Sequence, residues 1–103
     1  MKKIINGRKY DTETAKEIYY FDNGYCKVSD FKWYRETLYQ KKTGEYFLHG
    51  EGNGLSPYKE YVPNCGYGRG EKIIPLSENG AKKWAEKNCD GDDYEDIFGE
   101  VEE

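Results

Sequence analysis

The sequence predicts a small α+β domain: an antiparallel β-sheet of about three strands and an N-terminal hairpin, packed with two or three short helices. Three observations favour this class. Residues 31–49 are rich in aromatic side chains and contain Lys-Thr-Gly at 42–44, which is typical of a β-hairpin. Residues 77–88 place apolar side chains at helical spacing after a Ser. The length of 103 residues suits one domain, which we expect to span residues 1–103.

The N-terminal elements are predicted from turn and cap residues. Asn-Gly at 6–7 tolerates the positive φ angles of a type I′ turn, so a small hairpin is expected around it. A helix capped by Asp11 or Thr12 is expected to follow and to run through Glu17, because apolar side chains recur at i, i+3 and i+4. Asp-Asn-Gly at 22–24 is expected to end this helix.

The C-terminal third is predicted to contain one strand and two helices. Residues 71–76 form the third strand candidate, and Pro75 indicates a sheet edge or a strand end. Ser77 is expected to cap a helix that ends near Asn88. A short helical turn is predicted over residues 92–98, where it would bury Tyr94, Ile97 and Phe98.

A long glycine-rich segment, residues 50–70, separates the hairpin from the third strand. Loops of this length are usually functional or disordered, and a turn of helix is expected to start at Ser56. Neither of its glycine runs matches the G-x-G-x-x-G pattern of a phosphate loop. Tyr58, Tyr61 and Tyr67 lie here, where a core role is difficult to support, so we expect them at a surface that contacts a partner.

The formal net charge of −4 conceals an uneven distribution. All 16 Lys and Arg residues precede Asp90, together with 12 of the acidic residues, so residues 1–89 carry +4. The acidic C-terminal segment, residues 90–103, has eight acidic and no basic side chains, a charge of −8. Such asymmetry is typical of an interaction segment or of an internal counter-charge.

The acidic segment is the first candidate partner-binding site. Carboxylates along a short helix imitate a row of phosphates and can occupy the basic groove of a nucleic-acid-binding protein. Two other interpretations stay open: a solubilising tail, and a segment that neutralises the basic body. The candidate residues are Asp90, Asp92, Asp93, Glu95, Asp96 and Glu100.

A basic and aromatic stripe is the second candidate site. Exposed on one face, such side chains would stack with bases and pair with phosphates, as in proteins that bind single-stranded RNA or DNA. The alternative is that the aromatic residues form the core, with basic neighbours lying along it. The low number of Leu, Ile, Val and Phe, 17 in all, favours this alternative. The candidate nucleic-acid-binding residues are Trp33, Arg35, Tyr39, Lys41 and Lys42.

No catalytic residue, metal site or cofactor is predicted. His49 is the sole histidine, and a lone His on a strand is usually a packed or surface residue, although a weak RNase that uses His49 stays open as an alternative. Cys26, Cys65 and Cys89 form no C-x-x-C pair, so we expect reduced thiols in a cytosolic protein. No run approaches the ~20 apolar residues of a membrane-spanning helix.

Four segments carry a family resemblance: KIING at 3–7, YDTETAK at 10–16, ETLYQKKTGEYFLHGEG at 36–52 and EKIIPL at 71–76. The WAEK sequence at 84–87 and the Asp-rich end fit the same pattern, so the match covers most of the chain. Together they resemble a family of short proteins from phages and mobile elements of Gram-positive bacteria. Some members of that family are type II-A anti-CRISPR proteins, which inhibit the RNA-guided effector nuclease.

The resemblance implies a small inhibitor that acts in the cytoplasm of the bacterial host by binding the type II effector nuclease, with or without its guide RNA. It implies no catalytic residue and no cofactor. The expectation is physically coherent, because effector nucleases of this kind hold guide RNA and DNA in positively charged channels. The acidic segment would compete for such a channel, whereas the basic aromatic stripe would contact the guide RNA. The step that is blocked, guide-RNA loading, DNA binding or cleavage, stays open.

Overall fold

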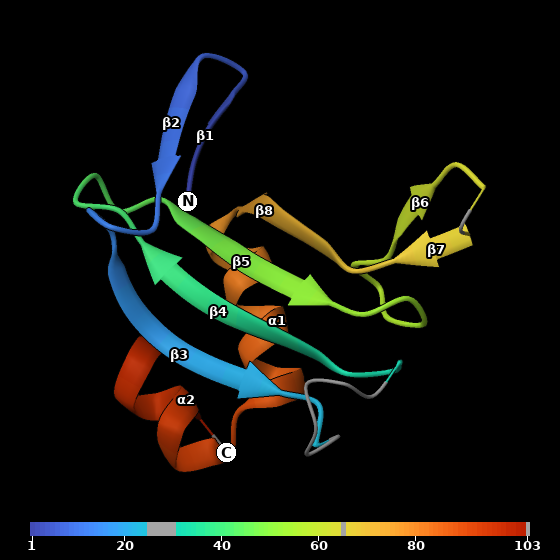
Figure 1. Cartoon of the computed structure of the whole chain (residues 1–103). Coiled ribbons are helices and arrows are strands. Elements are labelled where there is room, and N and C mark those ends of the chain that lie inside the picture. Colours follow the sequence, from blue (N-terminus) through green and yellow to red (C-terminus); the bar gives the residue numbers. More distant parts are fainter. Residues whose placement is uncertain (25–30, 65, 103) are drawn as a thin grey trace.

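The computed structural model describes residues 1–24, 31–64 and 66–102, and it shows an α+β fold (Figure 1). A four-stranded antiparallel sheet lies at its centre, with strand order β3-β4-β5-β8. The strands of this sheet are β3 (Lys16–Asp22), β4 (Tyr34–Gln40), β5 (Tyr46–Gly52) and β8 (Gly70–Leu76). Two separate hairpins are formed by β1 (Lys2–Ile5) with β2 (Arg8–Asp11), and by β6 (Glu60–Val62) with β7 (Gly66–Gly68). The helices are α1 (Glu78–Asn88) and α2 (Gly91–Phe98).

The N-terminal hairpin is confirmed. Asn6 and Gly7 connect β1 to β2 with φ angles of 51° and 76°, which are the positive values that a type I′ turn requires. The turn makes Ile5 and Arg8 cross-strand partners. The hairpin therefore follows from the chemistry of its two turn residues.

The prediction of a helix from Asp11 or Thr12 through Glu17 is wrong, because the chain makes a turn and then enters β3. The Asp11 side chain accepts a hydrogen bond from the backbone N–H of Glu13 at 2.9 Å and stabilises a turn instead of capping a helix. β3 then pairs with β4, with Tyr20 opposite Thr37. The aromatic run at 19–21 suits a pleated sheet, and a helix of less than two turns would have gained little by comparison.

The strands β4, β5 and β8 and both helices agree with the predictions. β4 and β5 form the central hairpin, and β8 is an edge strand in which Pro75 lies opposite Phe47. The Ser77 hydroxyl accepts the backbone N–H of Gly80 at 3.0 Å at the start of α1. The Asp90 carboxylate does the same for Asp93 at 2.9 Å at the start of α2.

The glycine-rich segment is more ordered than predicted. β5 extends through Gly52, and the small β6–β7 hairpin replaces the expected loop. The expectation for Tyr58 is wrong, because its side chain is only 2% exposed. A Cβ at Gly50 would overlap the Tyr58 ring, so the glycine provides the space that this ring fills. Tyr61 and Tyr67 are at the surface as expected, with exposed fractions of 67% and 60%.

The two faces of the sheet are covered differently. On one face, Leu38 and Leu48 pack with Ala81 of α1, and Phe98 of α2 lies at the border of this cluster. On the other face, Tyr10 of β2 packs on Phe47 and Ile73. We call this second face the open face, because no helix or strand of the described residues covers its centre, as Figure 1 shows. None of the described helices is long and apolar enough to span a membrane.

Candidate binding surfaces

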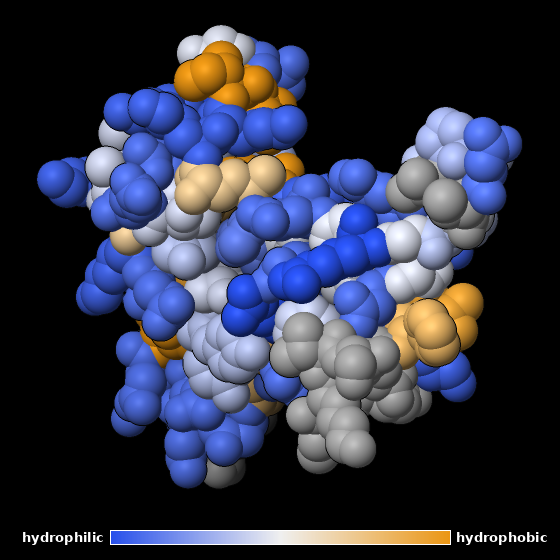
Figure 2. Space-filling view, viewed as in Figure 1, coloured by the Kyte–Doolittle hydropathy of each residue, from blue (hydrophilic) through white to orange (hydrophobic). Residues whose placement is uncertain are grey.

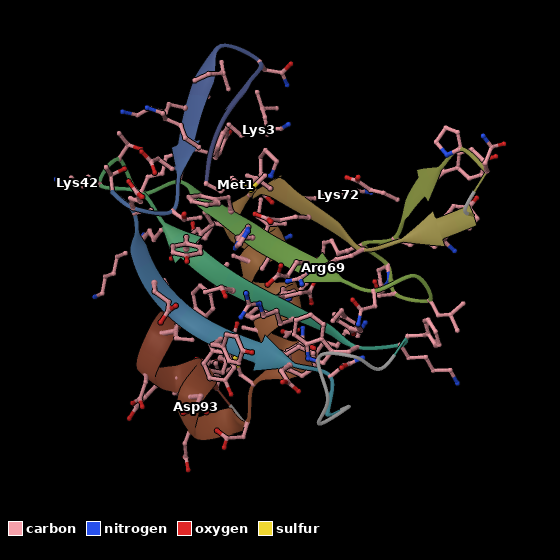
Figure 3. The ribbon with its side chains drawn as sticks, viewed as in Figure 1. Met1, Lys3, Lys42, Arg69, Lys72 and Asp93 are labelled. Carbon is pink, nitrogen blue, oxygen red and sulfur yellow. The ribbon has the colours of Figure 1, made fainter. Side chains whose placement is uncertain are left out.

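A buried carboxylate shared by two arginines lies on the open face. The β4–β5 register places Arg35 directly opposite Glu51, whose exposed fraction is only 4%. Arg35 forms an ion pair with one Glu51 oxygen, and Nη2 of Arg69 lies 2.6 Å from the other, Oε2. Arg69 is just before β8, and Figure 3 shows its side chain reaching back across the sheet. We call these three residues the Arg–Glu–Arg cluster.

Trp33 forms the floor of this cluster. Its ring is 3% exposed, and the guanidinium carbons of Arg35 and Arg69 lie 5.7 Å and 6.0 Å from the ring centroid. These are cation–π distances, so Glu51 and Trp33 together hold both guanidinium groups in place. The arginine side chains stay 44% and 55% exposed, and each guanidinium has five N–H donors, more than its contact with Glu51 uses.

The electrostatics of the Arg–Glu–Arg cluster keep Glu51 ionised. Burial on its own raises the pKa of Glu51, but the hydrogen bond from Arg69 and the charges of both arginines outweigh burial and lower it. Arg35 shows the matching effect, since Glu51 overcomes the desolvation of the guanidinium and raises the pKa of Arg35. The cluster therefore carries a net charge of +1 at neutral pH.

His49 lies next to this cluster on the open face. Its Nε2 is 2.8 Å from Oε1 of Glu71, and its side chain is 19% exposed. The β5–β8 register makes His49 a partner of Ile73, so Glu71 reaches it diagonally along β8. A His–carboxylate pair is one component of acid–base chemistry, and RNase activity of His49 stays a prediction.

Apart from Lys42, the predicted nucleic-acid-binding residues follow one face of the β4 segment, but the aromatic members are packed rather than exposed. Trp33 lies beneath the Arg–Glu–Arg cluster, and Tyr39 stacks on Phe47 with ring centroids 5.2 Å apart. Lys41 lies 3.7 Å over the Tyr10 ring and 2.6 Å from a carboxylate oxygen of Glu45. Lys42, the next residue in the chain, is exposed and is labelled in Figure 3. The aromatic members therefore belong to the packing of the sheet, as the alternative interpretation expected.

Lys41 and Lys42 instead line a cleft of about 520 Å³ at the N-terminal end of the molecule. Arg8 and Lys9 of β2 line the same cleft. Glu45 forms ion pairs with both Arg8 and Lys41, and Asp11 also lines the cleft, so four cations face two carboxylates. The cleft is a mixed-charge surface with a small positive excess.

The predicted acidic site is an ordered helix that is docked on the body. Phe98 contacts Tyr46 of β5 and Tyr94 of its own helix, with ring centroids 5.9 Å and 5.1 Å away. The Tyr19 hydroxyl donates to Oδ2 of Asp93 at 3.2 Å. The three expected contact residues, Tyr94, Ile97 and Phe98, are all half-buried.

The carboxylates of α2 are directed toward solvent. Asp92, Glu95 and Asp96 are exposed, and no carboxylate between positions 90 and 102 forms an ion pair with Lys or Arg in the described part of the chain. Lys82, whose Nζ lies 5.9 Å from the Phe98 ring centroid, pairs with Glu78. The segment therefore compensates the charge of the basic body through no direct ion pair among the described residues.

The thiol of Cys89 lies at the junction of α1 and α2. Burial, and after it the negative charges of Asp93 and Asp90, raise its pKa to about 11. Cys89 is a free cysteine, as expected, whereas Cys26 and Cys65 lie outside the described residues. A thiol in this electronegative setting is protonated and inert at neutral pH.

Tyr61 and Tyr67 were predicted to lie at the surface, whereas the role of their basic neighbours was not predicted. The β6–β7 register makes these tyrosines cross-strand partners, and Nζ of Lys59 lies 5.0 Å over the Tyr67 ring. Arg69, two residues after Tyr67, was also missed. The signal available in the sequence is the alternation of Lys59 with Tyr61 and of Tyr67 with Arg69, which places each pair on one face of a strand.

Over the described residues, no group of three or more His, Cys, Asp or Glu side chains is placed to hold a metal ion. No family model matches the chain, and it has no match among curated proteins or solved structures.

Proposed function

We propose that this protein is a non-enzymatic inhibitor that binds the type II RNA-guided effector nuclease through the carboxylates of α2. The observation that carries the proposal is the combination of order and charge in this helix. Phe98 packs the helix on the sheet. The acidic side chains of residues 90–102 form no ion pair with Lys or Arg in the described part of the chain. The family resemblance of residues 36–52 and 71–76 supports the choice of target.

The charge density of this segment is close to that of DNA. Five carboxylates lie between Asp90 and Asp96, and a helix rises about 1.5 Å per residue, which gives about one negative charge per 2 Å. Duplex DNA carries about one charge per 1.7 Å of its axis. A groove that binds a phosphate backbone without reading sequence would therefore accept this helix, and would do so by releasing counterions in the same way.

The proposal is tested by purifying the inhibitor with the effector nuclease, with and without guide RNA. We expect retention on the nuclease and inhibition of DNA cleavage by the wild-type chain. Retention only on the guide-free nuclease would indicate competition with guide RNA, and retention on the loaded complex would indicate a block of the DNA channel. Absence of retention in both states would reject the proposed target.

A pair of matched variants tests the role of α2. The combined substitution Asp92→Asn, Glu95→Gln and Asp96→Asn removes three exposed carboxylates and leaves Asp93, which contacts Tyr19, in place. Its control removes the same charge from exposed carboxylates on the body: Glu13→Gln, Glu17→Gln and Glu60→Gln. We expect inhibition to be lost in the first variant and kept in the second. Equal inhibition by both would remove α2 from the mechanism.

A further inference from the structure

We propose that the β6–β7 hairpin and the adjoining Arg–Glu–Arg cluster form a binding site for a single-stranded polynucleotide. Its bases would stack on Tyr61 and Tyr67, and its phosphates would pair with Lys59, Arg69 and Arg35. This site lies away from α2 and is independent of the function proposed above.

The register of the β6–β7 hairpin determines which side chains share a face. Tyr61 lies opposite Tyr67, and Glu60 lies opposite Gly68, so alternation places the two tyrosines on one face and Glu60 on the other. The tyrosine rings meet edge to face, with centroids 5.7 Å apart and planes at 70°. In this geometry one ring directs its edge at the face of the other, and both side chains stay about two-thirds exposed to a planar group.

This face of the hairpin is continuous with the open face of the sheet. Arg69 follows Tyr67 by two residues and reaches Glu51, which lies opposite Arg35. Lys59 lies over Tyr67, on the same side of the hairpin. Aromatic rings and three cations thus follow one another from the tip of the hairpin to the centre of the sheet. Figure 2 shows strongly hydrophilic atoms crossing this part of the surface, and Figure 3 identifies Arg69 there.

The hairpin is firmly attached to the sheet although it exposes its aromatic residues. A two-stranded hairpin is marginally stable by itself in water. Here the backbone is packed tightly where the hairpin joins the sheet. A Cβ at Gly70 would overlap the carbonyl oxygen of Tyr58, and a Cβ at Gly54 would lie 2.7 Å from the carbonyl oxygen of Tyr67. Figure 1 shows the hairpin projecting from the sheet. A projecting arm that holds two tyrosines about two-thirds exposed is suited to contact a partner.

The chemistry of the surface favours a polynucleotide over an acidic protein. The three cations named above outnumber the two carboxylates of this face, Glu51 and Glu71, so with His49 neutral the excess charge of these groups is +1. Cations next to exposed π faces match a chain that alternates phosphates with planar bases. The bases of a duplex are stacked inside it and would not reach the tyrosines, so the ligand is single-stranded.

The test measures fluorescence anisotropy of labelled 12-nucleotide oligo-U and oligo-dT and of a 12-base-pair DNA duplex, with the wild-type protein alone. Because no nuclease is present, failure here does not affect the function proposed for α2. We expect both single strands to bind, with the duplex at least tenfold weaker. Preference for oligo-U or for oligo-dT decides between RNA and DNA as the ligand. The logarithm of affinity is expected to fall with the logarithm of salt at a slope of about −2, as for three phosphate contacts.

The variant Tyr61→Ser with Tyr67→Ser is expected to weaken single-strand binding at least about tenfold. The matched control is Ile4→Ser with Lys9→Gln, a cross-strand pair on the N-terminal hairpin, and it is expected to bind like the wild type. Lys59→Gln keeps both tyrosines and is expected to reduce the salt slope by about 0.7. Far-ultraviolet circular dichroism that is unchanged in each variant ensures that the fold is intact.

Three results would overturn the proposal. They are no binding of either single strand at 100 µM protein, equal affinity of the tyrosine variant and the wild type, and duplex binding as tight as single-strand binding. Capture of an acidic protein by the same hairpin without any oligonucleotide binding would also overturn it, and would assign the surface to a protein partner.

Discussion

Gly50 shows how a single missing side chain shapes the sheet. The Tyr58 ring occupies the space above it, and the Tyr58 hydroxyl donates to Glu36, which also accepts the indole N–H of Trp84 at 3.1 Å. We expect Gly50→Ala to lower the free energy of unfolding by about 1–3 kcal/mol, because the new Cβ displaces Tyr58. Chemical denaturation measures this.

The control for this substitution is Gly91→Ala in the first turn of α2, where a Cβ would meet no atom within 4 Å. There the free energy of unfolding is expected to stay unchanged or to rise by up to about 1 kcal/mol. Equal effects of the two substitutions would mean that Tyr58 does not occupy the space above Gly50.

The pH dependence of stability tests the Glu51 ion pairs. Because both arginines hold the pKa of Glu51 below its ordinary value of about 4.3, folding favours the ionised carboxylate. This contribution is fully present above about pH 4.3 and is lost as the pH falls through the lowered pKa. We expect Glu51→Gln to be less stable than the wild type at pH 7 and to approach it at acidic pH. A constant difference in the free energy of unfolding between wild type and variant from pH 7 to pH 2 would contradict the lowered pKa of Glu51.

The reactivity of Cys89 provides a second residue-scale test. Its pKa of about 11 leaves very little thiolate at pH 8. We expect its alkylation by iodoacetamide at pH 8 to be about 100-fold slower than that of a model thiol with a pKa of about 8.5. Mass spectrometry of the peptide that contains Cys89 measures the rate. A rate within a few-fold of the model thiol would show that the site is not electronegative.

At the scale of elements, the docking of α2 can be separated from its charge. Phe98→Ala removes the ring that contacts Tyr46 but keeps every carboxylate. We expect the free energy of unfolding to fall by about 1–3 kcal/mol, since the ring is half-buried, and inhibition of the nuclease to weaken. Val101→Ala, at a side chain that is 59% exposed, is the control. Full inhibition by the Phe98 variant would mean that the charge of the segment is sufficient for inhibition without docking of α2 on the sheet.

Elements specified by local chemistry were predictable from the sequence. Asn6-Gly7 and Ser77 each act within four residues, and the structure confirms the hairpin and the helix that they predict. β3 was not predictable in the same way, because Ala15, Ile18 and Tyr19 also fit a helical face. Its true partner is β4, whose pairing residues lie 13 to 24 positions away. The β6–β7 hairpin was missed because each strand has three residues, two of them glycine in β7.

The binding surfaces show the same division. The acidic helix was predictable because its charge and its apolar spacing lie within one continuous segment. The Arg–Glu–Arg cluster was not, because Arg35, Glu51 and Arg69 are far apart in the sequence and meet only through the β4–β5 register and the return of the chain before β8. The acidic surface of α2 can therefore be predicted from composition, whereas the Arg–Glu–Arg cluster depends on strand pairing.

At the scale of the whole molecule, the two proposed surfaces lie at different ends of a body that measures 50 × 33 × 20 Å (Figure 1). Because they share no residue, we expect their effects to be independent. The α2 variant should bind oligo-U with wild-type affinity, and the Tyr61 and Tyr67 variant should keep its affinity for guide-free nuclease. Loss of both activities in either variant would indicate a single continuous site.

The most direct test of the central claim is the salt dependence of affinity for the effector nuclease. The dissociation constant is measured between 50 and 300 mM salt for the wild type and for the variant with Asp92→Asn, Glu95→Gln and Asp96→Asn. If α2 replaces a phosphate backbone in a basic channel, the wild type loses affinity steeply with salt, and the variant binds more weakly with a shallower slope. Equal affinities and equal slopes would show that these carboxylates do not contact the nuclease.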